Sequence, residues 1–173
     1  MKKTVKKLTF VFETVLLVFL FCFISTVSFA QRYPQFSPEP QKLTCVNATL
    51  GNNSLNLMLA RTNYERAKGL MFYEELASST GMLFVFEEPH KMSFWMMNTR
   101  IPLDLIFFSE DLTVTEWIKN MVPGYGKPAY RLPHYASNDK AKYALELKAG
   151  SIEELNIKIG DKLEIPLILL YCE

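Results

Sequence analysis

The sequence is poor in the residues that usually build metal centres and nucleophilic sites. It contains two histidines and three cysteines in 173 residues, and no Cys or His pair stands at a zinc-binding spacing. Neither Cys45 nor Cys172 lies in a recognisable nucleophile motif. We therefore expect no metal and no cofactor, and we assign no catalytic residue.

An excess of charge of either sign is also absent. The net charge is +1, and loss of residues 1–30 would remove four lysines and one glutamate, leaving −2. Proteins that bind nucleic acid concentrate lysine and arginine on one surface. We therefore expect no nucleic-acid partner.

Long hydrophobic runs are missing outside the N-terminus. There, four lysines precede an apolar run over Val15–Ile24, and Ser28 and Ala30 are small residues at a signal-peptidase position. This pattern predicts a signal peptide over residues 1–30 and an exported protein, periplasmic or secreted. The alternative is an uncleaved anchor, for which the run is short. After cleavage no membrane span remains.

The exported part consists of a tether and one domain. Residues 31–42 contain three prolines and no apolar periodicity, which is typical of a linker. Residues 43–173 are enough for one domain with a real core. Cys45 and Cys172 stand near the two ends of that domain. An exported chain permits a disulfide between them, and two free buried thiols are the alternative.

The apolar pattern of the domain is mostly that of short strands. Leucine alternates over 55–60, and a capping box from Thr62 to Glu65 predicts a short helix that Gly69 ends. The same box predicts a second helix at Ser151–Glu154. Further strands are expected over 82–86, 93–97, 103–108, 114–119, 141–147 and 163–172.

Prolines interrupt this pattern. Pro89 is expected to end the strand over 82–86, and Pro166 marks an edge or a bulge. Seven or eight strands joined mainly by turns predict a mainly β fold. We expect an antiparallel β-sandwich or barrel with two short marginal helices, which is α+β by strict count.

Five ordered blocks of sequence resemble one known family. They are Arg61 to Met71, Gly81–Phe86, Phe94–Asp104, Ala141–Leu147 and Gly160-Asp161. Together they resemble the family called domain of unknown function 192, over about residues 55–165. The resemblance implies a compact, mostly β domain, often exported, with no established activity. Two departures from the family pattern are Met97, where a charge is usual, and a longer, tyrosine-rich segment before Ala141.

Acidic residues within apolar strands are the first candidates for a site. Asp104 stands in the strand over 103–108, and a buried carboxylate needs a partner or a raised pKa. Arg61, Arg66, Arg100 and Lys142 are the candidate partners. Glu146, near Lys142, raises the same question. For both acids a structural ion pair is favoured over catalysis, and capping of the Asn98-Thr99 turn is a further structural role for Asp104.

A second candidate group surrounds Trp95. Together with Asn98 and Thr99 this ring could hold a ligand by stacking and hydrogen bonds, whereas core filling plus a turn is the alternative. Soft ligands for copper are also present, namely His90, Met92, Met96 and Met97. The tyrosine-rich segment 120–140 is expected to be either a lid or an ordered surface loop.

The favoured function is a non-enzymatic module of the cell envelope that binds a small ligand or a partner protein. The candidate binding residues are Trp95, Asn98, Thr99, Asp104, Arg61, Lys142 and Glu146. The alternatives are an envelope hydrolase that uses Asp104 or Glu146, and a copper-handling protein that uses methionine and His90. Two titratable groups converging in one open cleft would favour the hydrolase.

Overall fold

The computed structural model describes residues 36–77 and 79–171. The predicted signal peptide, residues 31–35 of the tether and Cys172 lie outside these residues, so the proposed pairing of Cys172 stays a prediction. Cys45 is exposed and forms no disulfide within the described residues. Residues Pro38–Glu173 form a compact unit of their own. Within the described residues, no helix combines the length and apolar character that crossing a membrane requires.

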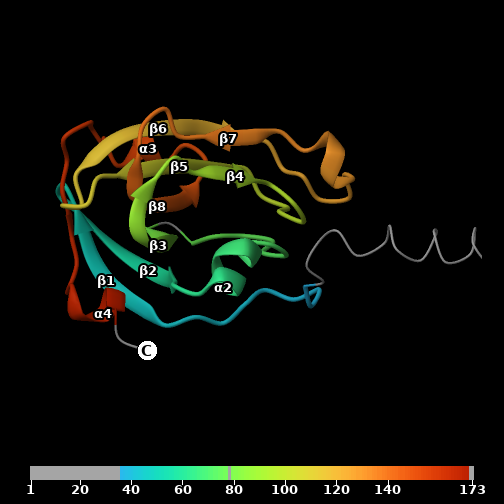
Figure 1. The fold of residues 1–173 in the computed structure, drawn as a ribbon, viewed down its shortest axis with the longest axis horizontal. Coiled ribbons are helices and arrows are strands. Elements are labelled where there is room, and N and C mark those ends of the chain that lie inside the picture. Colours follow the sequence, from blue (N-terminus) through green and yellow to red (C-terminus); the bar gives the residue numbers. More distant parts are fainter. Residues whose placement is uncertain (1–35, 78, 172–173) are drawn as a thin grey trace, which may run out of the picture. The chain divides into compact units, whose positions relative to one another are not determined.

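Short strands dominate this unit, with short helices between them (Figure 1). In chain order the elements are β1 (Cys45–Leu50), β2 (Asn53–Ala60), α2 (Asn63–Lys68), β3 (Thr80–His90), β4 (Ser93–Trp95), β5 (Leu103–Phe108), β6 (Val114–Met121), η1 (Ala129–Arg131), β7 (His134–Ala136), β8 (Ala141–Lys148), α3 (Ser151–Glu154), β9 (Leu163–Glu164) and α4 (Ile168–Tyr171).

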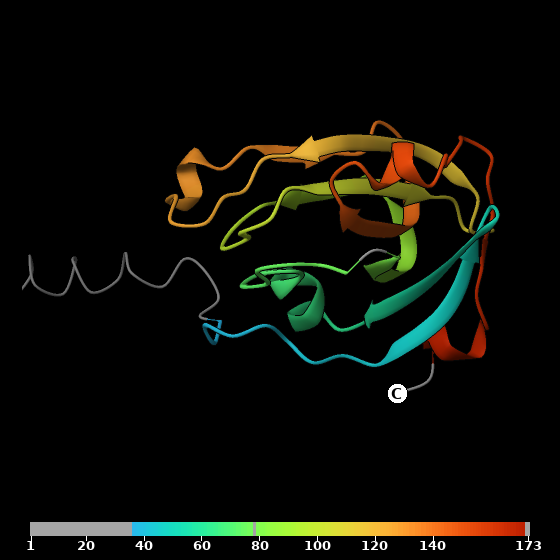
Figure 2. The same cartoon turned by 180° about the vertical axis from the view of Figure 1, so that it is seen from behind.

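Seven of these strands form one curled sheet in the order β6-β5-β8-β3-β2-β1-β9. Its two edges meet where Thr113, just before β6, bridges Lys162, just before β9. Figure 2 shows β1 and β2 on the opposite side of the curl from β5 and β6. The mainly β prediction is confirmed as a half-barrel. Only β2 and β3 pair in parallel among its described strands, because α2 connects them as a crossover.

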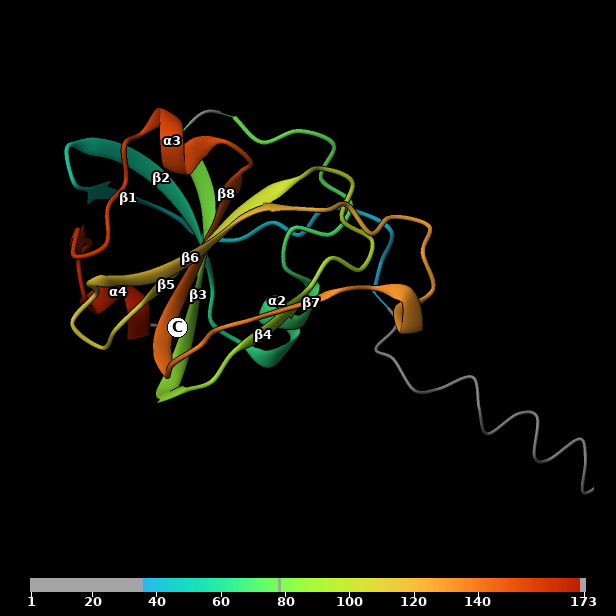
Figure 3. The ribbon, with the colours of Figure 1, turned by 90° about the horizontal axis from the view of Figure 1, so that it is seen from above.

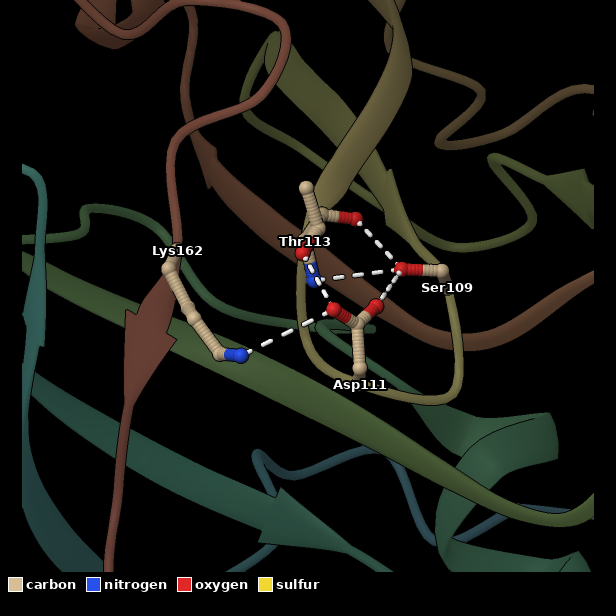
Figure 4. Close-up of polar contacts among 4 residues, drawn as sticks. All are labelled: Ser109, Asp111, Thr113 and Lys162. Carbon is tan, nitrogen blue, oxygen red and sulfur yellow. Dashed lines mark hydrogen bonds and ion pairs between the residues drawn. The ribbon is translucent and has the colours of Figure 1, made fainter.

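The seam between the sheet edges is fastened by the turn that joins β5 to β6 (Figure 4). The Asp111 carboxylate accepts hydrogen bonds from the hydroxyls of Ser109 and Thr113 and lies 3.6 Å from the Lys162 ammonium. The hydroxyl hydrogen bonds lower the pKa of Asp111 to about 2. The turn is therefore held by a carboxylate that stays ionised throughout the ordinary pH range.

The curled sheet separates two hydrophobic cores. The first core fills the curl and takes residues from all seven strands, such as Leu57, Leu83 and Leu145. The second core lies on the other face, beneath the short sheet formed by β4 and β7 and the segment after α2. Five methionines belong to the second core and none to the first: Met58, Met82, Met92, Met96 and Met121.

Several local predictions are confirmed. Thr62 and Glu65 form the capping box at the start of α2, and Gly69 ends the helix at a positive φ of 48°. The Gln41 amide, from the predicted tether, donates to the backbone carbonyls of Glu65 and Gly69 at the other end of the helix. Both ends of α2 are therefore satisfied by groups close to it in sequence or in space.

Other local predictions are wrong. The helix α3 forms at Ser151–Glu154 as predicted, but the predicted capping box is absent: its N-cap is Gly150 in the left-handed conformation, and no side chain of the helix caps it. Strand β3 continues through Pro89 to His90, although its pairing with β8 shifts register after Val85. The closing strand ends at Glu164, and α4 follows instead. For β3, pairing of His90 with Ala141 of β8 overrides the local signal of Pro89.

Asp104 links the edge of the curled sheet to α3. Two residues of β6, Lys119 and Asn120, lie opposite Asp104 of β5, which makes a β-bulge in β6. Because of this bulge the Asn120 N–H is not used in the hydrogen bonds between the two strands. Asp104 Oδ1 accepts that N–H at 2.9 Å, and Oδ2 accepts the Ile152 N–H of α3 at 3.1 Å. Its side chain is fully buried. The predicted ion pair of Asp104 and its predicted capping of the Asn98-Thr99 turn are therefore wrong: its partners are backbone groups of the bulge and α3.

We expect Asp104→Asn to destabilise the domain by about 2 kcal/mol, because the amide keeps one acceptor but sets an NH2 group against a backbone N–H. Urea unfolding followed by circular dichroism measures the change. The matched control is Asp139→Asn at an exposed carboxylate, which should change stability by less than about 0.5 kcal/mol. Equal stability of the two variants would contradict the role of Asp104.

Candidate functional site

A groove of about 480 Å³ lies between α2, the last part of β3 and the β4–β7 sheet. These elements gather at one end of the curled sheet (Figures 1 and 3). The volume is in the range of small-molecule sites, and the walls are mostly apolar, with four Phe or Trp side chains among them. The groove is lined by Asn63, Arg66, Ala67, Phe84, Phe86, His90, Met92, Ser93, Phe94, Trp95 and His134.

The pairing of β4 with β7 builds one wall of the groove. Trp95 is opposite His134 in this pair, and Ser93 Oγ lies 3.4 Å from His134 Nδ1. Alternation along β4 buries Phe94 in the second core and leaves Trp95 half-buried at the groove. The ring of Phe94 meets that of Phe84 edge to face, with centroids 5.1 Å apart. The aromatic walls therefore continue directly into the second core.

Arg66 is the one lysine or arginine side chain that lines the groove. Its guanidinium lies 4.7 Å from the centroid of the Phe86 ring and donates to the Val85 carbonyl and the Asn63 side chain. It also donates to the Arg61 carbonyl. Burial lowers the pKa of Arg66, and the nearby charges of Glu87 and Glu65 oppose that shift. These bonds hold the guanidinium against the wall.

A small cavity of about 20 Å³ adjoins the groove and shares five lining residues with it. That volume admits one group of about the size of a water molecule. The shared residues are Arg66, Ala67, Phe84, Phe94 and Trp95, and the small cavity is further lined by Lys68, Gly69, Leu70, Met71, Met97, Thr99 and Glu146.

Glu146 is the acidic residue of the small cavity. It lies in β8 opposite Met82 and Leu105, and 4% of its surface is exposed. Among the described residues no hydrogen bond or ion pair reaches its carboxyl group. Burial raises the pKa of Glu146 to about 8, so the group is mostly protonated at neutral pH. An unpartnered acid in a core is expensive and therefore a functional candidate.

Three of the predicted binding residues come together here. Trp95 lines both cavities, and Thr99 and Glu146 line the small one. Thr99 also has a structural role, because its carbonyl accepts the N–H groups of Gly124 and Tyr125. Asn98 lies in the same turn at a positive φ of 54°, and its carbonyl accepts the Phe72 N–H.

The other predicted residues lie elsewhere. Asp104 faces the first core side of the sheet, whereas Glu146 faces the second, so the two acids do not converge. Lys142 pairs with Glu110 at 2.6 Å, and an Arg61 Nη1–H reaches the Leu169 carbonyl at 3.4 Å. Arg100 pairs with Glu74 and stacks on Tyr125, 4.3 Å from the ring centroid. None of these cations is the partner of Asp104.

The four candidate copper ligands do not line one common cavity. His90 and Met92 line the groove, Met97 lines the small cavity, and Met96 is fully buried in the second core. Within 36–77 and 79–171, no cluster of three His, Cys, Asp or Glu residues could hold a metal ion. Tyr125, Tyr130 and Tyr135 do not line the groove or the small cavity, which favours the ordered loop over the lid.

Sequence reasoning missed the groove because its walls meet only in the folded chain. The apolar run over 82–86 predicts only a core strand for Phe84 and Phe86, and the sequence suggests for Arg66 only an ion pair with Asp104. His134 stood in a segment without periodicity. Neither segment contains a sequence feature that indicates the pairing of residues 93–95 with 134–136. The position of Trp95 opposite His134 could therefore not be predicted from the sequence.

Comparisons with known proteins agree with this fold. Residues 45–165 match the model of the DUF192 family, described as "Uncharacterized ACR". A crystal structure of a candidate transcription regulator from Sinorhizobium meliloti 1021 is 31% identical, with a TM-score of 0.66 over 72% of this chain and 96% of that chain. A protein of unknown function from Novosphingobium aromaticivorans DSM 12444 is 35% identical, with a TM-score of 0.64 over 75% and 93%. No curated protein matches.

Because the pKa of Glu146 is raised in the folded protein, we expect the free energy of unfolding to fall as the pH rises. Between the ordinary pKa of 4.5 and the folded value of about 8, the unfolded chain releases a proton that the folded chain keeps. The folding equilibrium therefore weakens by up to about tenfold per pH unit in this window and levels off above it. Glu146→Gln removes this loss, so its stability relative to the wild type should increase from about pH 5 to about pH 8.

Urea unfolding across that pH range provides the measurement. Glu154→Gln, at an exposed glutamate of α3, is the matched control and should follow the wild type at every pH. A stability difference between Glu146→Gln and the wild type that stays constant with pH would contradict the buried, protonated carboxyl.

Proposed function

Since this chain belongs to the DUF192 family, whose description names no reaction, we propose its function from the groove itself. We infer a non-enzymatic module that binds a small ligand with an apolar, planar body. The observation that carries this proposal is the set of four aromatic side chains, Phe84, Phe86, Phe94 and Trp95, around a space of about 480 Å³. Apolar walls with a few polar groups are typical of small-molecule sites.

The polar groups of the groove favour binding over hydrolysis. A hydrolase of the predicted kind needs two titratable groups in one cleft, and Asp104 and Glu146 lie on opposite faces of the sheet. Asp104 accepts two backbone N–H groups. The Ser93–His134 contact of 3.4 Å is long for an activated nucleophile, and no carboxylate among the described residues orients the His134 ring.

Methionine gives the site room to adapt. Met71, Met92 and Met97 line the two cavities, and the adjacent second core holds four more methionines. Flexible thioether side chains repack around ligands of different shape at low energetic cost. This property supports a binding role in which the groove adjusts to its ligand.

We further propose that the module acts in the cell envelope or outside the cell. The support for this is the N-terminal pattern over residues 1–30, which is typical of a secretory signal. A small envelope molecule is the proposed ligand, with a partner protein as the alternative. The regulatory role named for the Sinorhizobium protein is not extended to this chain, because the groove offers a single arginine and apolar walls.

The two tryptophans provide a test of the groove. Trp117→Phe leaves Trp95 as the only indole, and Trp95→Phe leaves Trp117, which packs against the first core. The ligand panel consists of benzene derivatives that carry a hydroxyl, carboxylate or ammonium group. We expect at least one of them to change the fluorescence emission of Trp95 saturably in the Trp117→Phe variant. The same compound should leave the emission of the Trp95→Phe variant unchanged.

Two results would contradict the proposal. One is a panel in which no compound changes Trp95 emission at millimolar concentration. The other is an equal response of both single-tryptophan variants, which would show nonspecific binding or binding elsewhere.

A further inference from the structure

The small cavity is lined by three aromatic rings, one acid and two cationic side chains, Arg66 and Lys68. Rings of Phe84, Phe94 and Trp95 stand around a space for one water-sized group, and one acid, Glu146, lines the same space. Aromatic faces attract cations through the ring quadrupole, and walls of several rings are a known way to hold an ammonium group. A carboxylate among them supplies the opposite charge.

We propose that the small cavity recognises a primary ammonium group, with the Glu146 carboxylate as its counter-ion and the three aromatic rings as its walls. The inference rests on the proposed function, because the apolar body of the ligand would occupy the groove. It adds the ligand class, which is an amine attached to an aromatic or other apolar body. A volume of about 20 Å³ fits –NH3⁺.

Glu146 lacks the partner that such a ligand would bring. Its surface is 4% exposed, and among the described residues no hydrogen bond to its carboxyl group contributes to its raised pKa, which burial alone causes. Thr99 is the hydroxyl residue in the cavity wall, and its Oγ1 donates to the Met97 carbonyl while keeping acceptor capacity. An ammonium group carries three N–H donors, so Glu146 and Thr99 together would satisfy two of them.

The cations near the cavity do not neutralise Glu146. Arg66 and Lys68 of α2 line the same space, while β3, β4 and β5 contribute no charged side chain to it. Arg66 is held by the Arg61 and Val85 carbonyls and by Asn63, and the Lys68 ammonium lies 6.0 Å from the Tyr64 ring centroid. Burial is the cause of the raised pKa of Glu146, and neither cation offsets it.

Binding of an ammonium group therefore requires Glu146 to ionise. Below its folded pKa of about 8 the carboxyl must release its proton when the amine enters. The affinity for an amine should rise by up to about tenfold per pH unit from about pH 6 and level off near pH 8. A neutral ligand of the same shape should bind without this dependence.

The experiment compares 2-phenylethylamine with 2-phenylethanol and 3-phenylpropionate on the full mature chain, by titration calorimetry and Trp95 emission. We expect the amine to bind at least tenfold more tightly than the alcohol at about pH 8, and the carboxylate to bind most weakly. Glu146→Gln should lose at least tenfold in affinity for the amine and less than about twofold for the alcohol. Glu154→Gln, at an exposed site, should match the wild type.

Two further measurements secure the result. Calorimetry in buffers of different ionisation enthalpy should show the release of nearly one proton per amine bound at about pH 7. This measurement uses the wild-type protein, so it does not depend on the folding of a variant. Histidine as a residue type changes charge near neutrality, and His90 and His134 line the groove. The pH dependence should therefore persist in the double variant His90→Gln, His134→Gln.

The outcomes separate this inference from the proposed function. If the alcohol or the carboxylate binds at Trp95 as tightly as the amine, the groove binds ligands but the ammonium site is wrong. No proton release, or an unchanged amine affinity in Glu146→Gln, would overturn it as well. If none of the three compounds binds, the ammonium proposal is wrong, and the proposed function is judged by the separate screen on the single-tryptophan variants.

Discussion

The Asp104 carboxylate is the contact on which the arrangement of the sheet edge depends. It fixes two backbone segments far apart in sequence, the bulge at Asn120 and the start of α3 at Ile152. Both N–H groups lack a partner in their own element, the first because of the bulge and the second because it lies in a first helical turn. One fully buried acid thus replaces two missing hydrogen bonds. A carboxylate used in this way is a structural group, and its oxygens are not available for chemistry.

The curled sheet then places its two acids in opposite surroundings. Alternation along β5 turns Asp104 toward the first core, whereas Glu146 in β8 lies with Met82 and Leu105 on the second. Asp104 finds two donors, and Glu146 finds a space of about 20 Å³ instead. The same residue class therefore has a structural role on one face and is left unpartnered on the other. This difference in surroundings is the reason that we look for function at Glu146.

The groove exists because β4 leaves the main sheet. β4 pairs with β7 instead and lies over the second core, so a space remains between this pair and α2. Gly124 holds the base of that layer close to the turn after β4: its N–H donates to the Thr99 carbonyl, and an added Cβ would lie 2.2 Å from the Met96 carbonyl oxygen. A methyl group there would clash with backbone, so a glycine is required.

Local chemistry in the sequence determined much of the fold. The leucines of β2, the capping box at Thr62, the apolar run of β5 and the alternation in β8 are properties of neighbouring residues, and each predicted its element. Family resemblance and the mainly β class follow from the same blocks. Tertiary structure alone decided the partners of Asp104, the pairing of residues 93–95 with 134–136, and the burial of Glu146 beside Trp95 and Thr99. Those features arise from contacts between segments tens of residues apart, and periodicity within a segment carries no information about which distant segment it will meet.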